Sequence, residues 1–252
     1  MHFGFWDKQT PNRQAAILNE NQAIVTKGKI KNGQRILDAG CGVGGTAIYI
    51  AETTGAQVVG ITLDPHQVKL ATKYASQKGV SHLTSFIVQD FHHTNLAPGS
   101  FDVVYAIESS CYASPRSVFL KEAYKLLKPG GRLVIADGYQ GRAAKNKKER
   151  ELLSQFKSAF VLPKLVMGVE MSQLIAEAGF KNVQGASVRE EVGPSVRHFY
   201  NLSKLAWPLA QVAKFIPSSP IRALYPNTLV LKLTGQLYKL GLADYWLHWA
   251  TK

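Results

Sequence analysis

A carboxylate followed by a run of glycines is the first pattern in the chain with a chemical meaning. The stretch RILDAGCGVGG places Asp38 ahead of a loop that contains Gly40, Cys41, Gly42 and Gly44. Glycine permits unusual backbone angles and lets a ligand approach the backbone closely. The loop lacks the Gly-Lys-Ser/Thr ending of a phosphate-binding loop, and a carboxylate beside it would repel a pyrophosphate. The pattern therefore disfavours nucleoside triphosphates and dinucleotides, and it favours a ligand that carries an ammonium group.

A second group of polar side chains follows the apolar run of residues 101–107. The stretch AIESSCYASP contains Glu108, Ser109, Cys111 and Tyr112. If the apolar run is a strand of a parallel sheet, these side chains lie at the carboxyl edge of the sheet, where such sheets bind their ligands.

The elements that position these residues alternate between apolar, β-rich runs and helical patterns in the first half of the chain. Helical stretches are expected to start near Thr46, Pro65 and Pro115, since proline suits a first helical turn. This alternation predicts βαβ units and an α/β fold with a parallel sheet covered on both faces. The expected strands of this half are residues 35–39, 57–62, 83–89, 101–107 and 131–138.

The second half of the chain has a different character. The basic run of residues 141–150 is interpreted as a solvated start of a helix, and a further helix is expected to end at Gly179. A sixth strand is predicted over residues 181–192 and a last strand over residues 243–252. Between these two strands lies a segment rich in aromatic residues and leucine, residues 194–240.

Composition bounds the class of protein. The 252 residues suffice for one large domain, and no apolar run reaches the roughly 18 to 20 residues of a membrane span. The N-terminus does not resemble a signal peptide, and two cysteines suggest no disulfide framework, so a reducing, cytoplasmic location is expected. The net charge of +13 is of the sign that attracts phosphates or an anionic membrane surface, and the alternative is that it serves solubility alone. No nucleic-acid-binding signature is present, so we expect no nucleic-acid partner.

The motifs LDAGCGVGG, VQDF, FDVVYAIE and LLKPGGRLVIAD, in this order and spacing, resemble the class I S-adenosylmethionine-dependent methyltransferases. The resemblance covers nearly the whole chain and implies a single methyltransferase domain over residues 1–252. It implies a doubly wound, mostly parallel, Rossmann-like sheet of seven strands whose last strand is antiparallel. It also implies S-adenosylmethionine as the cofactor.

Cofactor contacts carry over from this resemblance by position. Asp38 and the loop of Gly40, Cys41, Gly42 and Gly44 would hold the methionine end of the cofactor. Three further cofactor contacts are expected: an acceptor for the adenine amine, a ring against the adenine, and a residue on the fourth strand. These residues are Asp90, Phe91 and Ala106.

One position departs from the common pattern of the family. Many members carry an acidic residue at the end of the second strand to bind the ribose hydroxyls, whereas this chain has Thr62. Cyclopropane-lipid synthases are similar in having a threonine there and a glutamine five residues later, which matches Gln67. We therefore expect Thr62 and Gln67 to contact the ribose or the methionine end, and Asp64 to cap the following helix.

The stretch after residue 107 is similar to that of isoprenoid carbon methyltransferases. Sterol side-chain methyltransferases share the Ala-Ile-Glu opening, and prenyl diphosphate carbon methyltransferases share Glu-Ser-Ser and the tyrosine. The resemblance implies methylation of an alkene in a hydrophobic, isoprenoid or sterol-like acceptor. Glu108 would stabilise the carbocation and then remove a proton, and Tyr112, Trp6 and Tyr139 are candidate aromatic walls, since aromatic faces attract cations. A structural role is the alternative for Glu108, and core packing for each aromatic residue.

Other reactive side chains have narrower roles. Cys111 is interpreted as a packing residue, because the cofactor already carries an activated methyl group. His92 and His93 are candidate bases for an oxygen or nitrogen acceptor. The seven histidines show no metal-ligand spacing and no dedicated carboxylate cluster is visible, so no metal site is predicted.

The two ends of the chain are expected to cover the site. Residues 1–30 would form an N-terminal cap, and residues 194–240 a helical lid inserted before the last strand. The mixture of apolar and basic residues in the lid suits a hydrophobic acceptor-binding pocket or peripheral contact with a membrane. Two alternatives stay open, namely O- or N-methylation of a small molecule or lipid head group, and a non-catalytic binding protein that kept the fold. The sequence does not indicate an oligomeric state.

Overall fold

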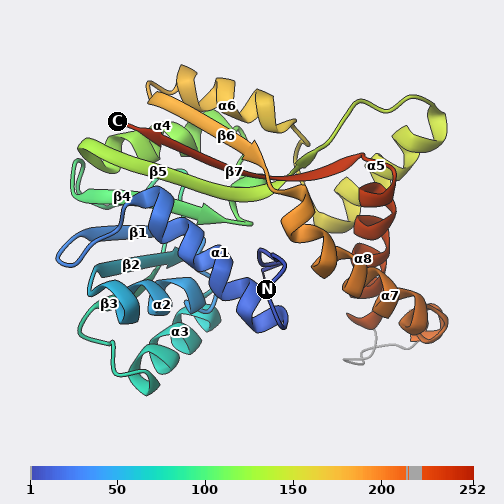
Figure 1. The fold of residues 1–252 in the computed structure, drawn as a ribbon, viewed down its shortest axis with the longest axis horizontal. Coiled ribbons are helices and arrows are strands. Elements are labelled where there is room, and N and C mark those ends of the chain that lie inside the picture. The colour runs from blue at the N-terminus through green and yellow to red at the C-terminus, as the bar shows by residue number, and fades with distance from the viewer. Residues whose placement is uncertain (1, 214, 216–222) are drawn as a thin grey trace.

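The computed structural model of the chain describes residues 2–213, 215 and 223–252. One seven-stranded sheet runs through these residues in the order β3-β2-β1-β4-β5-β7-β6 (Figure 1). The first five strands pair in parallel, and β7 runs antiparallel to both of its neighbours. This topology confirms the predicted mostly parallel sheet and its antiparallel last strand. The strands are β1 (Arg35–Ala39), β2 (Gln57–Thr62), β3 (Thr84–Val88), β4 (Phe101–Ile107), β5 (Leu127–Gln140), β6 (Lys181–Ser187) and β7 (Ala243–Thr251).

Helices cover both faces of the sheet (Figure 1). Helices α1 (Arg13–Gly28), α2 (Gly45–Thr54) and α3 (Pro65–Gln77) pack on one face, and α4 (Arg116–Leu126) and α6 (Gly168–Glu177) pack on the other. Successive strand residues bury alternately in these two cores, as Ile36 and Leu37 do, which explains why the strands are continuously apolar. Helices α5 (Lys147–Phe160), α7 (Arg189–Ala213) and α8 (Leu224–Lys239) gather beyond one end of the sheet.

Most predicted boundaries agree with the structure. The predicted bounds of β1, β2 and β4 are confirmed. Asp64 caps α3 by accepting a hydrogen bond from the His66 amide at 2.8 Å, and Pro65 is the first residue of that helix. Gly179 follows the last residue of α6 in the left-handed conformation, as predicted, with a φ of +100°.

Other boundaries differ, and those of β3 and β7 differ by only one residue at an end. Strand β5 begins at Leu127 rather than at residue 131, and Pro115 precedes α4 instead of lying in its first turn. Strand β6 ends at Ser187, and residues from Arg189 onward form α7, so the strand predicted to residue 192 was too long. Glu190 and Glu191 lie in the first turn of α7, where the helix dipole favours acidic side chains.

The two predicted covers touch one another. The Trp6 amide donates to the carbonyl oxygen of Glu191 at 2.9 Å, and the Trp6 indole donates to the Ser195 hydroxyl at 2.8 Å. The Ser195 hydroxyl in turn donates to the carbonyl oxygen of Phe3. The segment ahead of α1 is therefore tied to α7.

Helices α7 and α8 lie between β6 and β7, where the lid of residues 194–240 was expected, although α7 begins five residues earlier. Part of that segment, residues 214 and 216–222, lies outside the described residues. Every helix among the described residues is too short or too polar to cross a membrane.

Candidate cofactor and acceptor site

The glycine loop lies between β1 and α2, tight against the end of β4. Gly40 has a φ of +97°, and a Cβ built on it would lie 2.4 Å from the Cβ of Ser109. The Ser109 hydroxyl donates to the carbonyl oxygen of Ala39 at 2.6 Å, which joins the two strand ends. Gly42 has a φ of +52°, and a Cβ built on it would meet nothing within 4 Å. The loop thus packs against β4 at one glycine and faces open space at another.

Asp38, at the base of this loop, is a buried carboxylate with a single polar contact. It is 4% exposed, and the Tyr105 hydroxyl donates to it at 2.7 Å. Among the described residues it forms no ion pair. Burial raises the pKa of Asp38 to about 7. A carboxylate that is buried with one neutral donor fits a ligand that brings its own positive charge, such as an amino-acid ammonium group.

The neighbouring Cys41 is buried, and burial raises the pKa of its thiol well above the ordinary value. Cys41 is therefore a protonated packing residue, and its backbone is the part that the loop can offer to a ligand.

A cavity of about 110 Å³ lies where β4 and β5 end, beside α7 and α8. Its wall combines many aromatic rings with a few carboxylates, so it suits an apolar ligand that develops or carries positive charge. The seven aromatic residues are Phe3, Tyr112, Tyr139, Phe156, Phe160, Tyr238 and Tyr245, and the three acidic residues are Glu108, Asp137 and Asp244.

The structure brings together only some of the residues predicted for acceptor chemistry. Glu108 and Tyr112 line the cavity, as does Tyr139. Trp6 does not line it and is held by Ser195 instead. His93 is exposed on the loop after β3 and does not line it either, so it is not placed to act as a base there.

Glu108 has an unusual backbone and a half-buried side chain. Its φ of +49° lies in the left-handed region, which non-glycine residues rarely adopt outside functional or tightly constrained sites. Its Oε1 accepts from the Phe3 amide at 3.0 Å and lies 3.2 Å from the Tyr245 hydroxyl oxygen. Burial, and then the negative charge of Glu20, raises the pKa of Glu108 to about 8. A carboxyl group with a pKa near neutral is suited to accept and release a proton.

Glu20 of α1 shares this environment and was missed by the sequence analysis. It is fully buried, and it accepts from the Tyr245 hydroxyl at 2.8 Å and from the Gly4 amide at 3.2 Å. Burial raises the pKa of Glu20 to about 7. Nothing in the local sequence marks it, because a glutamate within a helix is ordinarily a solvated residue.

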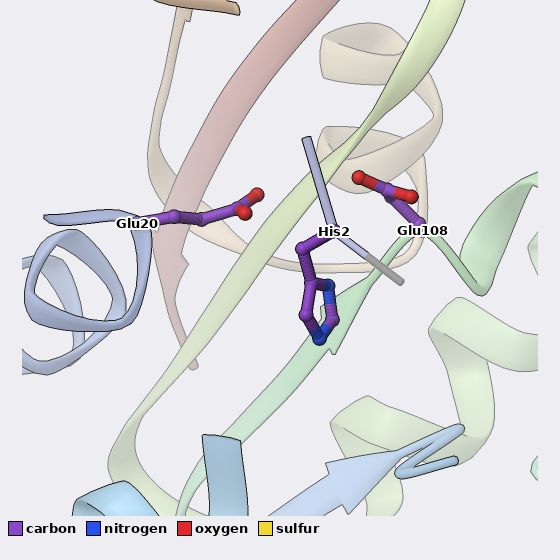
Figure 2. Close-up of side chains that lie close together, drawn as sticks. All are labelled: His2, Glu20 and Glu108. Atoms are coloured by element: carbon purple, nitrogen blue, oxygen red, sulfur yellow. The ribbon is translucent and has the colours of Figure 1, made fainter. Parts of the chain in front are cut away.

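His2 completes a cluster with these two glutamates (Figure 2). A ring nitrogen of His2 and one carboxylate oxygen each of Glu20 and Glu108 lie within 4.8 Å of one another. Burial lowers the pKa of His2 to about 4, so its ring is neutral near pH 7. His2, Glu20 and Glu108 are far apart in the chain, so no local pattern of the sequence indicates that they lie together.

Asp137, at the end of β5, was also missed as a site residue. It is 2% exposed and accepts from the Ser110 hydroxyl at 2.6 Å and from the Cys111 amide at 2.8 Å. These bonds hold the loop after β4 in place. Its position as a lone carboxylate late in a buried strand, in the stretch LVIADG, was the signal that could have identified it.

The predicted ribose contacts meet at the end of β2. The Thr62 hydroxyl donates to Oε1 of Gln67 at 2.7 Å, and both residues are half-buried. The structure thus brings together the two residues that were chosen on sequence, whereas Asp64 is engaged by its own helix.

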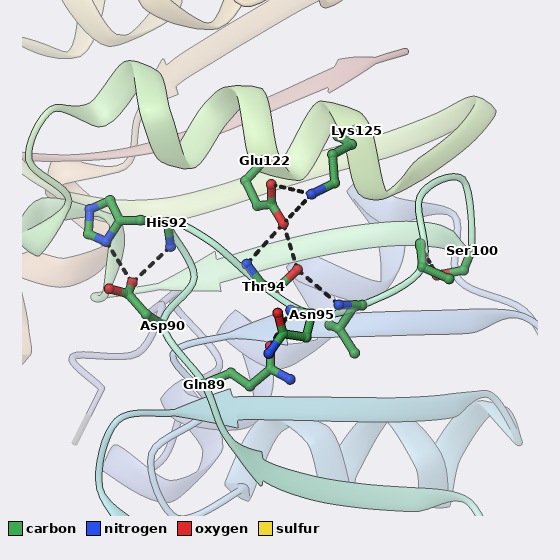
Figure 3. Close-up of polar contacts among 10 residues, drawn as sticks. Gln89, Asp90, His92, Thr94, Asn95, Ser100, Glu122 and Lys125 are labelled. Carbon is green, nitrogen blue, oxygen red and sulfur yellow. Dashed lines mark hydrogen bonds and ion pairs between the residues drawn. The ribbon is translucent and has the colours of Figure 1, made fainter.

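The loop after β3 carries the predicted adenine contacts (Figure 3). Oδ1 of Asp90 accepts from the His92 amide at 2.8 Å and lies 2.6 Å from Nδ1 of the His92 ring. Burial acts to raise the pKa of Asp90, but the bonds from His92 outweigh it and lower that pKa. The Thr94 amide and hydroxyl both donate to Glu122 of α4, at 3.0 and 2.6 Å, and so anchor the loop.

The remaining two predicted contacts differ in accessibility. The Phe91 ring is half-buried and packs edge-on against Phe119 at 5.2 Å between ring centroids. Ala106 is fully buried in β4, so none of its surface is available to a ligand.

Comparisons with known proteins agree with this geometry. A family model described as "Methyltransferase domain" matches residues 37–135, which include the glycine loop and Glu108. An O-methyltransferase of Aspergillus nomiae is 30% identical over 197 residues, which are 77% of this chain and 86% of that protein. A sterol 24-C-methyltransferase of Aspergillus fumigatus is 41% identical over 130 residues, which are 52% of this chain and 34% of that protein.

A solved structure is similar in fold over the whole chain. It is that of geranyl diphosphate C-methyltransferase from Streptomyces coelicolor in complex with Mg²⁺, geranyl diphosphate and S-adenosyl-L-homocysteine. The TM-score is 0.77 at 16% identity, and the match covers 100% of this chain and 90% of that one.

Proposed function

The chain belongs to the S-adenosylmethionine-dependent methyltransferases, and we propose that it methylates a carbon atom of a hydrophobic, isoprenoid- or sterol-like acceptor. The observation that carries this proposal is the cavity at the ends of β4 and β5, in which seven aromatic side chains accompany the Glu108 carboxylate. The sterol 24-C-methyltransferase relative and the fold shared with geranyl diphosphate C-methyltransferase support the same class of acceptor.

S-adenosylmethionine is the cofactor, and it supplies a methyl group already activated on a sulfonium. In our proposal Asp38 binds the ammonium group, and the backbone of Gly40, Cys41 and Gly42 borders the methionine end. The protein's task is then alignment and exclusion of water rather than activation of the methyl donor.

The nucleoside end would be bound by the neighbouring strand ends. Thr62 and Gln67, already hydrogen-bonded to one another, would bind the ribose hydroxyls. Asp90 would accept from the adenine amine, and Phe91 would pack on the ring. Ala106 and His93 are not part of the proposed site, because the first has no accessible surface and the second does not line the cavity.

Glu108 has a defined role in this reaction. The electron pair of an acceptor alkene would form the new carbon–carbon bond to the methyl group while the bond from that methyl group to sulfur breaks and its electron pair stays on the sulfur. A positive charge would then lie on the neighbouring carbon of the acceptor. The Glu108 carboxylate stabilises that charge and then takes a proton from an adjacent carbon, which restores a double bond. Tyr112 and Tyr139 line the same cavity, and their aromatic rings would favour the cation.

The N-terminal cap of residues 1–30 and the lid of residues 194–240 would close the cavity as one unit. The bonds of Trp6 to Glu191 and Ser195 support this, because they tie the first segment to the lid helix α7. Phe3 from the cap and Tyr238 from α8 both line the cavity. A cover of this kind keeps water from the carbocation.

We place the protein in the cytoplasm, with the lid resting on an anionic membrane from which the acceptor enters. One face of α7 exposes Leu202, Leu205, Leu209 and Val212, with exposures of 45%, 80%, 61% and 61%. Their spacing puts them on a single helix face. Residues 192–243 contain six lysines and arginines and no acidic residue, so the charge of this region is complementary to an anionic bilayer.

The deciding experiment is incubation with methyl-labelled S-adenosylmethionine and a panel of sterols, squalene, prenyl diphosphates and quinol precursors, analysed by mass spectrometry. We expect the label on a carbon atom of an isoprenoid acceptor. The second candidate is O- or N-methylation of a small molecule or lipid head group, which the O-methyltransferase of Aspergillus nomiae favours because it matches most of this chain. Label found only on oxygen or nitrogen would establish that candidate instead.

A further inference from the structure

The carboxyl groups of Glu20 and Glu108 meet at one tyrosine hydroxyl. The Tyr245 hydroxyl lies 2.8 Å from Oε1 of Glu20 and 3.2 Å from Oε1 of Glu108. A phenol has one proton to donate, so it can satisfy only one of these two carboxylates at a time. Figure 2 shows the two carboxyl groups pointing toward one another from opposite sides, with the His2 ring beside them.

The surroundings supply little to balance two negative charges. The His2 ring is neutral near pH 7, because burial lowers its pKa to about 4. Arg13 of α1 donates to the carbonyl oxygen of His2 at 3.3 Å, and it forms no ion pair with either glutamate. Among the described residues, no lysine or arginine is ion-paired to Glu20 or Glu108. The positively charged N-terminal amino group also acts on the pair and lowers the pKa of both glutamates, but burial outweighs it. The other titratable groups that interact with the pair are acids, namely Asp137, Cys111, Tyr112 and Tyr245.

We propose that Glu20 and Glu108 form one acid pair that holds a shared proton in the free protein near neutral pH. Glu20 is then a positioning residue, because its charge decides when Glu108 is ionised and able to accept a proton. The pairing of the two glutamates rests on their common contact with Tyr245 and their mutual proximity, whereas its catalytic consequence rests on the proposed function.

The electrostatics of the site agree with this geometry. Burial raises the pKa of Glu20 to about 7 and that of Glu108 to about 8. Two carboxylates in one water-poor site repel one another, and protonation of one removes that repulsion. A positive charge brought next to the pair favours its ionised form, so the shared proton then leaves to solvent. The pair is therefore set to become fully charged when a cation is present in the site.

The test is a carbon-detected NMR titration of protein labelled with ¹³C at the glutamate carboxyl carbons, without cofactor or acceptor. In the wild type we expect one proton on the pair near pH 7. Glu20→Gln should lower the pKa of Glu108 by about one unit or more, because it removes a neighbouring negative charge. Tyr245→Phe should raise the pKa values of both glutamates, since it removes the donor that favours their ionised forms. Glu177→Gln, the same substitution on an exposed helix residue, should change neither value.

Several outcomes would overturn the proposal. Both glutamates could be ionised throughout the neutral range in the wild type, a result that needs no variant to fold. Glu20→Gln could leave the titration of Glu108 unchanged. Mg²⁺, Mn²⁺ or Zn²⁺ could bind to the wild type at one equivalent and fail to bind to Glu20→Gln. That result would show that His2, Glu20 and Glu108 form a metal site rather than a pair of carboxyl groups that holds a proton.

A second readout separates this proposal from the proposed function. If the acceptor is methylated on carbon, the acid limb of the turnover pH profile should move to lower pH in Glu20→Gln and stay in place in Glu177→Gln. Failure of the carbon-methylation assay would leave the NMR titration, and therefore the shared proton, intact.

Discussion

The Tyr105 hydroxyl donates to the Asp38 carboxylate at 2.7 Å, across the neighbouring strands β4 and β1, on which these two residues are register partners. Tyr105 is itself fully buried. A single neutral donor orients the carboxylate without neutralising it. Asp38 is thereby oriented at the start of the glycine loop without a charged partner among the described residues, which makes this pair the clearest electrostatic feature of the proposed cofactor site.

Replacing Asp38 should weaken cofactor binding. Asp38→Asn removes the charge partner of the ammonium group but keeps the shape of the side chain. A hydrogen bond to a charged group is worth roughly 1.5 to 3 kcal/mol, which is about a 10- to 150-fold loss of affinity. Isothermal titration calorimetry with S-adenosylmethionine measures this loss of affinity. Asp64→Asn, a helix cap at the neighbouring strand end, is the control and should bind as the wild type does. Equal affinities for Asp38→Asn and wild type would contradict the assigned role.

Cofactor affinity should depend on pH with a definite sign. The pKa of Asp38 is raised to about 7 in the free protein, so the carboxyl group is protonated below that pH and ionised above it. The ionised form binds the ammonium group, so affinity should rise as pH rises through about 7 and fall as pH drops below it. The rise should end near pH 8, where an α-amino group itself loses its proton (about 7.7 to 8.0). Calorimetry across this range checks the prediction, and Asp38→Asn should lose the dependence below pH 7.

Glu108→Gln should separate chemistry from cofactor binding. The amide keeps the size of the side chain but cannot accept the proton, so turnover should fall by roughly 10² to 10⁴. Cofactor affinity should change little, and diverted products such as altered alkenes or water adducts are expected if a carbocation forms. The measurement is product analysis by mass spectrometry beside calorimetry, with Glu177→Gln as the matched control. Turnover close to that of the wild type, with the same product, would remove Glu108 from the mechanism.

The exposed face of α7 should govern binding to lipid. The wild type should sediment with anionic vesicles at low salt and be released by added salt, because exposed charges are screened within about 10 Å at 0.1 M ionic strength. A Leu205→Glu, Leu209→Glu double variant should lose most of this binding, since it puts negative charge and no apolar surface on the docking face. Val169→Glu, at a residue of α6 that is 54% exposed, is the control. Equal sedimentation with neutral and anionic vesicles would assign the +13 charge to solubility alone. Sedimentation velocity would show whether this face instead joins two copies of the chain.

Much of the fold could be predicted from the sequence, because the signals are local. Each strand of the parallel sheet is a continuous apolar run, and each proposed cofactor contact lies at or just beyond the end of such a run. Asp38 before its glycines, Thr62 at the end of β2 and Asp90 after β3 all lie at the same edge once the strands are parallel. Glu108 was identified for the same reason. The start of α7 was missed because the residues up to 192 suited either a strand or a helix, and only packing decides between them.

What only the tertiary structure decided is how polar groups from distant parts of the chain are buried together. Glu20 lies in the middle of a helix and Tyr245 on the last strand, and no periodicity links either of them to Glu108. Their contacts depend on how α1 packs against the sheet and on where the antiparallel strand β7 inserts. Trp6 likewise contacts Ser195 and does not line the cavity, because the segment ahead of α1 lies against α7. Local sequence patterns determine which residues form strands and turns, whereas the neighbours of a buried charge, and hence its pKa, are set by contacts between elements that the sequence does not place side by side.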